Sequence, residues 1–124
     1  NILCAEMFDF EIPNNKYDLI ISIAAIHHGT KVQVEALINK IHEALVDGGN
    51  VFITVPDFES SKKWDTFKNH KEIAPGTFVP LSGPEQDLPH SFFTKKEVEK
   101  LFEQFSNVIL DLDDIGRWII RASK

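Results

Sequence analysis

Residues 17–55 read YDLIISIAAIHHGTKVQVEALINKIHEALVDGGNVFITV, and this stretch decides the fold of the chain. Its first part, residues 17–26, is almost entirely apolar without alternation, which predicts a strand covered on both faces. Its last part, residues 51–55, is a second apolar run that ends at Pro56. A helix between two such strands is the crossover unit of a parallel sheet.

The helix between these strands has recognisable ends in the sequence. Thr30 and Gln33 have the spacing of a capping box, in which each side chain accepts a backbone N–H at the start of a helix. Gly48 and Gly49 are expected to end the helix, because glycine tolerates the left-handed conformation that a helix stop often requires. Between these ends, apolar residues recur at helical spacing: Val34, Leu37, Ile38, Ile41, Ala44 and Leu45.

The rest of the chain predicts a long loop, a helix and a hairpin. Residues 57–91 have no strong period and contain four prolines and two glycines, so we expect a lid or binding loop with a short helix around residues 61–71. Thr94 and Glu97 form a second capping box before a helix. Residues 108–112 and 117–122 then predict two strands around a turn at 113–116. This alternation favours a three-layer α/β architecture.

Composition and charge narrow the class of protein. The length of 124 residues and a hydrophobic fraction of 43% fit one small globular domain. The net charge of −6 argues against nucleic acid as the main partner, since such a surface cannot neutralise many phosphates. No run reaches the ~18 apolar residues of a membrane span, and Cys4 is the only cysteine, so we expect a cytoplasmic protein.

Three segments together resemble one enzyme family. Residues 4–18, CAEMFDFEIPNNKYD, resemble a segment in which an acidic residue near an adenine precedes an aromatic and Asp pair. Residues 20–28, IISIAAIHH, resemble the following strand end, and DGG at 47–49 before NVFITVP resembles the element before the next strand. In this order the segments resemble the class I S-adenosylmethionine-dependent methyltransferases.

The resemblance implies a doubly wound, Rossmann-like, mostly parallel sheet with a closing antiparallel hairpin. Residues 1–124 would be the carboxyl-terminal portion of such a methyltransferase domain, because the family's glycine-rich cofactor loop does not precede residues 4–18. We therefore expect a truncated domain that binds S-adenosylmethionine weakly or not at all by itself and is inactive alone. Without a neighbouring strand, residues 17–26 would carry an exposed apolar edge, and we expect self-association there.

The resemblance also implies which residues contact the cofactor. Glu6 and Met7 would meet the adenine and ribose, and Ser22 and Ile23 would meet the cofactor at the strand end. The alternative for Glu6 is a solvated loop acid, since charged residues are mostly exposed.

The histidines are the candidate catalytic residues. His27 and His28 would lie beside the methyl-bearing end of the cofactor, where an imidazole orients an acceptor or takes its proton. The alternative is that one ring bonds a loop backbone and the other faces water. No third ligand is spaced to join them, so we expect no metal. His90 is a third candidate base, in a segment whose aromatic residues either wall a substrate pocket or pack the loop onto the sheet: Phe58, Trp64, Phe78, Phe92 and Phe93.

The implied activity is methyl transfer to a small-molecule acceptor. An in-line displacement needs mainly the alignment of donor and acceptor, so the lack of a nucleophilic triad is no objection. A non-catalytic methyltransferase-like scaffold or interaction module is the alternative. Another doubly wound enzyme, such as a dehydrogenase relative, is a third reading, which the closing hairpin and the lack of a Tyr-x-x-x-Lys motif disfavour.

Overall fold

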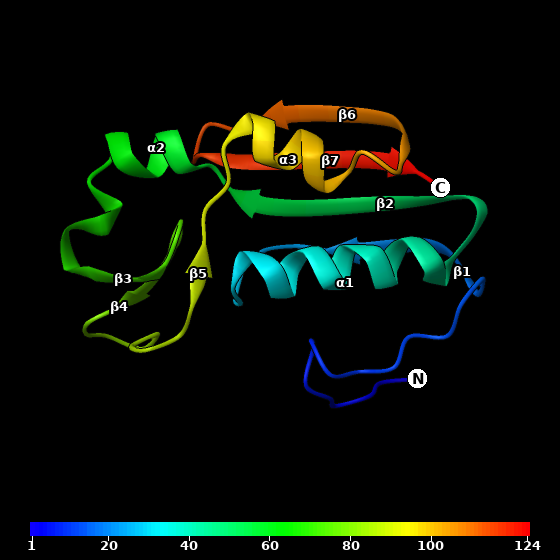
Figure 1. Ribbon diagram of the computed structural model, residues 1–124, viewed down its shortest axis with the longest axis horizontal. Helices are drawn as coiled ribbons and strands as arrows, with labels where there is room; N and C mark the ends of the chain where they lie inside the picture. The colour runs from blue at the N-terminus through cyan, green and yellow to red at the C-terminus, as the bar shows by residue number, and fades with distance from the viewer.

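The computed structural model describes residues 1–124, and the chain folds as a larger sheet with two helices on it and a smaller sheet at one end (Figure 1). The helices are α1 (Lys31–Ala44), α2 (Phe58–Lys63) and α3 (Lys95–Leu101), with one 3-10 helix, η1 (Thr66–Asn69). The strands are β1 (Tyr17–Ser22), β2 (Leu45–Pro56), β3 (His70–Ala74), β4 (Thr77–Pro80), β5 (His90–Ser91), β6 (Ser106–Leu112) and β7 (Arg117–Ser123).

The larger sheet has the strand order β1-β2-β7-β6. The strands β1 and β2 are parallel, with Ser22 opposite Ile53, and α1 is the crossover between them. The strands β7 and β6 add to β2 as an antiparallel hairpin, with Ile120 opposite Ile53. The predicted α/β fold with a closing antiparallel hairpin is therefore confirmed.

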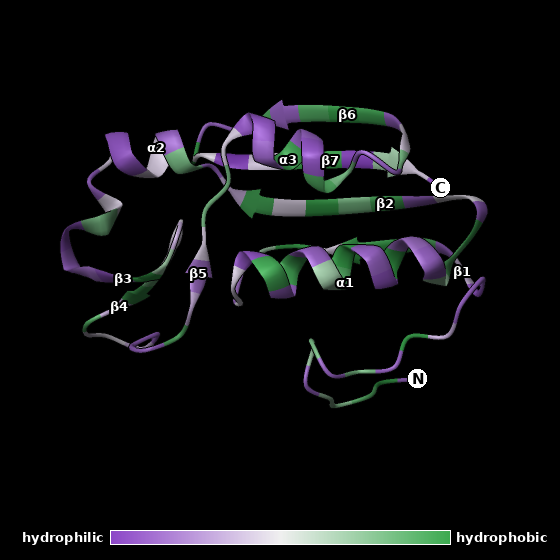
Figure 2. Ribbon diagram, in the orientation of Figure 1, coloured by the Kyte–Doolittle hydropathy of each residue, from purple (hydrophilic) through white to green (hydrophobic).

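The helices α1 and α3 pack on the same face of this sheet and enclose the core. Figure 2 shows hydrophobic colour along much of the sheet, while α1 carries both hydrophilic and hydrophobic stretches. The helical periodicity predicted for α1 is confirmed, because the apolar residues at that spacing are all at most 4% exposed. They meet the inward side chains of the sheet and of α3 in one cluster that includes Val51, Ile53, Val55, Val98, Phe102, Phe105, Trp118, Ile120 and Ala122.

The other face of the sheet is not covered, which corrects the prediction for residues 17–26. The strand β1 ends at Ser22 and lies at the edge of the sheet, and Leu19 and Ile21 are 55% and 58% exposed. The register places Ile21 in one row with Phe52, Arg121 and Ile109. The apolar run therefore gives this chain a strand with one buried face and one open face.

The capping box of α1 is confirmed, and its predicted end is wrong. Thr30 caps the helix and exchanges hydrogen bonds with Gln33. The helix ends at Ala44, four residues before Gly48, because Leu45 turns to an extended conformation with its side chain fully buried. The positive φ of Gly48, 76°, instead serves a turn inside the first half of β2, whose pairing with β1 is irregular there.

The segment 57–91 was predicted to be a long loop with one short helix. It instead contains α2, η1 and three short strands, β3, β4 and β5. Asp57 caps α2 through a 2.8 Å hydrogen bond from the backbone N–H of Ser60, so the short helix starts earlier than predicted. The strands β3, β4 and β5 form an antiparallel sheet in the order β3-β4-β5. This small sheet lies at the end of the molecule toward which β2 points (Figure 1).

The carboxyl-terminal predictions are confirmed with shifts of one or two residues. Thr94 and Glu97 form the capping box of α3. The helix ends at Leu101, and Phe105 is buried in the segment between α3 and β6. The turn between β6 and β7 is organised by Asp113, whose carboxylate accepts from the backbone N–H groups of Ile115 and Arg117 and from Arg117 Nε at 2.8 Å.

We expect Asp113→Asn to lower the stability at neutral pH by about 0.5–1 kcal/mol and to leave it unchanged in acid. Burial alone would raise the pKa of Asp113, but the hydrogen bonds and charge of Arg117 outweigh it and lower the pKa. A carboxyl group with a lowered folded pKa stabilises the fold above its unfolded pKa, and this contribution is lost as pH falls through the folded value. Urea unfolding at pH 7 and at about pH 2 measures the difference. An equal loss at both pH values would contradict this account.

The first residues of the chain form a coil over α1 and β1, and Met7, Phe8 and Ile12 pack against the core. Lys40 of α1 donates to the carbonyl oxygen of Phe8 at 3.1 Å. Among the helices, none combines the length and the apolar character that crossing a bilayer requires.

Candidate functional site

The carboxyl end of β1 continues into a turn, residues 23–30, that leads to α1. Within it Ala24 has a φ of 50°, a left-handed conformation that costs a non-glycine residue about 1–2 kcal/mol. Its N–H donates to Thr54 Oγ1 at 2.9 Å, and Thr54 is 3% exposed in β2. Such strain concentrates at binding sites. The sequence gives little sign of this contact, since its only signal is a threonine within the apolar run 51–55.

An apolar cavity of about 260 Å³ lies between the amino-terminal coil, β1 and α1. Met7 and Ser22, two of the four predicted cofactor residues, line it together. Glu6 and Ile23 do not line it, and both are exposed. The remaining walls are apolar: Leu3, Ala5, Phe10, Ile12, Ile20, Ile26, Leu37 and Ile41. Because Ser22 supplies the only polar side chain, the cavity suits a flat apolar group.

The three histidines named from the sequence lie together, although His90 is more than sixty residues from the others. Ring centroids are 4.1 Å apart for His27 and His28, 4.5 Å for His28 and His90, and 5.6 Å for His27 and His90. Ser91 explains the approach, because its N–H donates to the carbonyl oxygen of His27 at 2.8 Å and its hydroxyl donates to that of Gly29. The strand β5 is thereby fastened to the turn after β1, and we call His27, His28 and His90 the histidine cluster.

Two members of the histidine cluster have unpartnered rings. The Nδ1 atoms of His27 and His28 are buried and make no hydrogen bond. Burial lowers the pKa of His27 to about 3, with further lowering by the charges of His28 and His90. His27 is therefore neutral at physiological pH. An imidazole with so low a pKa is a weak base, so His27 is better suited to donating a lone pair than to removing a proton.

His90 is held from both sides of its ring. Its Nδ1 is 2.8 Å from the carbonyl oxygen of Leu88, and its Nε2 is 3.0 Å from Glu85 Oε2. The ring is nearly buried, while the Glu85 side chain is 59% exposed. Nearby, the Nδ1 of His70 is also buried without a partner, and burial followed by the charge of His90 lowers the pKa of His70.

The aromatic residues of segment 57–91 pack against one another. Phe67 and Phe78 stack at 4.2 Å, and Phe58 and Phe92 pack on Phe67 at 5.5 and 4.9 Å. Phe67 had not been singled out from the sequence. Trp64 is 51% exposed. The contacts favour the packing alternative over a substrate pocket for this group.

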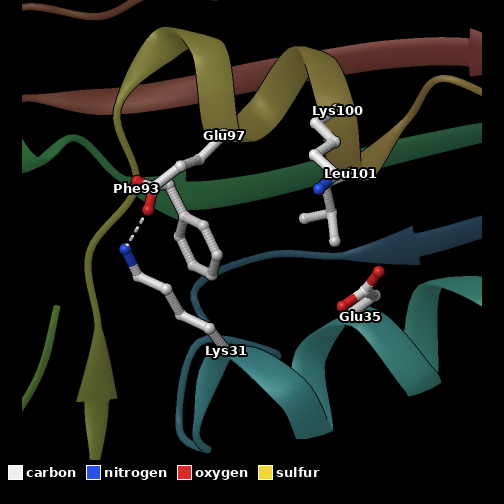
Figure 3. Close-up of a pocket in the computed structure, with 6 residues that line it drawn as sticks. All are labelled: Lys31, Glu35, Phe93, Glu97, Lys100 and Leu101. Carbon is white, nitrogen blue, oxygen red and sulfur yellow. Dashed lines mark hydrogen bonds and ion pairs between the residues drawn. The ribbon is translucent and has the colours of Figure 1, made fainter. Parts of the chain in front are cut away.

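A smaller cavity of about 130 Å³ lies between α1 and α3 (Figure 3). Lys31 points across it to Glu97, and their ion pair has a length of 2.5 Å beside the ring of Phe93. Burial alone would raise the pKa of Glu97, but Lys31 and the Thr94 cap outweigh it and lower the pKa. The charges of Lys31 and Glu97 are therefore paired with each other, and the ion pair links α1 to α3 across the crevice.

The sequence matches no family model and no curated protein, so its similarity to known proteins lies in the fold. A methyltransferase dependent on S-adenosylmethionine from Methanosarcina mazei is 16% identical, with a TM-score of 0.69 over 97% of this chain and 65% of that chain. One from Clostridium acetobutylicum is 12% identical, with a TM-score of 0.68 over 98% and 63%. The 1,6-didemethyltoxoflavin-N1-methyltransferase of Burkholderia thailandensis is 12% identical, with a TM-score of 0.66 over 98% and 49%.

These likenesses establish the fold and no more. The chain has the fold of part of a class I methyltransferase domain, as the resemblance predicted. It spans about half to two thirds of the length of these structures.

Proposed function

We propose that this chain forms part of an S-adenosylmethionine site in a methyltransferase that acts on a small molecule. The apolar cavity at the carboxyl end of β1, within a sheet of methyltransferase fold, carries the proposal. In open α/β sheets, ligands bind outside the carboxyl ends of the strands. Ser22 and the turn after it lie at such an end.

The residues around the cavity fit the proposed cofactor. Its apolar walls match the faces of an adenine ring, and the Ser22 hydroxyl adds one hydrogen-bonding group. Met7 lies in the wall, where its backbone N–H can donate to a ring nitrogen. The exposed carboxylate of Glu6 can accept from ribose hydroxyls or an amino group, and Ile23 offers backbone groups at the strand end.

The role of the chain in the reaction is to orient the two reactants. When bound, S-adenosylmethionine supplies an electrophilic methyl group for in-line transfer. His27 is neutral and can accept a hydrogen bond from an acceptor hydroxyl or amine without becoming charged. The rings of His28 and His90 lie close to that of His27 and can help to position the acceptor.

A small-molecule acceptor fits the charge of the chain. The net charge of −6 disfavours a polyanion such as nucleic acid. The Burkholderia protein is described with 1,6-didemethyltoxoflavin and S-adenosylhomocysteine bound, which is a small acceptor beside the spent cofactor. Nothing in the fold or the site favours the alternative of a non-catalytic interaction module.

We expect the 124-residue chain to bind S-adenosylhomocysteine with a dissociation constant of about 1 mM or weaker. The cavity offers one polar side chain and walls from a single side of the sheet, so few contacts are available to fix the ligand. Titration calorimetry and backbone NMR measure the affinity and the location. Shifts should concentrate at Met7, Ser22 and Ile26.

Residues of the α1–α3 crevice provide the control for this titration. Glu35 and Lys100 line that crevice and should not shift. Micromolar affinity would contradict the expected weakness while supporting the site. Shifts confined to the crevice would contradict the proposed cofactor site itself.

A further inference from the structure

We propose that the histidine cluster and Glu85 form a binding site for a divalent transition-metal ion of the zinc class. The inference does not depend on the proposed methyl transfer, and none of these four residues lines the apolar cavity. It depends on three observations: the convergence of the ligand atoms, the unpartnered rings of His27 and His28, and the two contacts of His90.

The histidine cluster has the compactness of a metal site. One nitrogen from each ring lies within 4.8 Å of the others. Tetrahedral zinc with Zn–N bonds of ~2.0–2.1 Å needs nitrogens about 3.4 Å apart. Small rotations about χ2, which is a broad torsion for histidine, can close the difference. The backbone clamp at Ser91 keeps β5 beside the turn, so the ion need not draw distant segments together.

The Nδ1 atoms of His27 and His28 are buried and have no hydrogen-bond partner within the chain. A buried polar atom without a hydrogen bond is unfavourable, and native structures contain few. Here two such atoms lie on adjacent residues whose rings face each other at 4.1 Å. Coordination through Nδ1 would give each of these two atoms a partner.

The contacts of His90 are the most specific observation. A carbonyl oxygen only accepts hydrogen bonds, so Nδ1 must carry the hydrogen that it donates to Leu88. Nε2 then lies 3.0 Å from the carboxylate of Glu85, so the position between these two atoms suits a cation, either a proton or a metal ion. Metal-ligating histidines typically show this arrangement, with the other ring nitrogen donating to a carbonyl.

The donor set selects the kind of ion. Three imidazoles with one carboxylate suit zinc, cobalt, nickel or copper, whereas magnesium and calcium prefer oxygen ligands. Glu85 is 59% exposed and can move from His90 to become a fourth ligand. An ion held there would lie at the carboxyl edge of β1, next to the strained turn at Ala24.

Zinc titration of the metal-free chain tests the site, with cobalt as the spectroscopic probe. The background should be Cys4→Ser, because the exposed thiol of Cys4 is a competing ligand atom outside the cluster. We expect one ion per chain, visible absorption of tetrahedral cobalt, and a higher melting temperature with zinc. The substitution His28→Gln should weaken binding by about 100-fold or more, and Glu85→Gln by about tenfold.

His42→Gln is the matched control, since His42 lies in the last turn of α1 and packs on Phe105 away from the cluster. It should leave the affinity unchanged. Glu85→Gln changes an exposed side chain, so it tests the site even if a cluster substitution fails to fold. Zinc affinity that is equal in all variants would overturn the proposal. Absence of zinc binding to the Cys4→Ser chain would also overturn it and would leave the His90–Glu85 contact as an ion pair.

Discussion

The substitution Ser91→Ala is expected to destabilise the chain by about 2–4 kcal/mol. The Ser91 hydroxyl donates to the carbonyl oxygen of Gly29, so it can only accept from the Thr77 hydroxyl at 2.7 Å. Ser91 and Thr77 are fully buried. Alanine would leave a carbonyl and a hydroxyl without partners in a site that water does not reach. Urea unfolding measures the loss, which should lower the midpoint by about 1–2 M.

Two further variants isolate this effect. Ser82→Ala removes an exposed hydroxyl that bonds only Asn69, and it should change the stability by less than about 0.5 kcal/mol. Thr77→Val removes only the hydroxyl that donates to Ser91, so it should reduce the stability by less than Ser91→Ala does. The double variant should then be less destabilised than the sum of the two single changes, because the residues share a hydrogen bond. Strict additivity, or a Ser91→Ala loss no larger than that of Ser82→Ala, would contradict the role of this clamp.

Local signals in the sequence predicted the helices and the hairpin well. The capping boxes at Thr30 and Thr94 are interactions between residues three apart, so their spacing is visible in the sequence. The turn at Asp113 is equally local. The confirmed elements are therefore those whose defining contacts lie within a few residues.

The errors arose where distant contacts decide the structure. Gly48 and Gly49 have the composition of a helix stop, but burial of Leu45 in the core ends α1 earlier. The small sheet depends on pairing between Phe78 and His90, and a segment rich in proline gives no periodic sign of such short strands. Likewise, the exposure of one face of β1 depends on which other segments pack against it, and an apolar run in the sequence does not show this.

The candidate site shows the same division. Met7 and Ser22 were placed together by a family resemblance, and they share a cavity wall. The sequence presents His27 and His28 as neighbours, but its spacing gives no sign that a third histidine lies beside them. The hydrogen bonds of Ser91 bring His90 to them across more than sixty residues. The contact between Glu85 and His90 is also not visible in the sequence, because a glutamate in a loop has no distinguishing pattern.

The open edge and face of β1 carry the other large prediction, which is that the 124-residue chain self-associates. Leu19, Ile21 and Ile23 are each more than half exposed, and the outer edge of β1 pairs with no other strand. Edge strands of stable monomers are usually short, charged or covered, and an apolar open edge favours pairing with a second chain. We expect dimers or larger species by analytical ultracentrifugation at high micromolar concentration.

A single charge at the centre of this surface should reverse the association. Ile21 lies opposite Phe52 in the exposed row, so Ile21→Lys would place a cation in any contact made by that row or edge. Burying an unpaired charge costs far more than the apolar contact contributes, and a symmetric interface would bring two such charges together. The variant should sediment as a monomer with unchanged circular dichroism. Val32→Lys is the matched control, because Val32 is 76% exposed on α1, outside this surface. A monomeric parent chain, or equal dissociation by both substitutions, would show that β1 is not the contact surface.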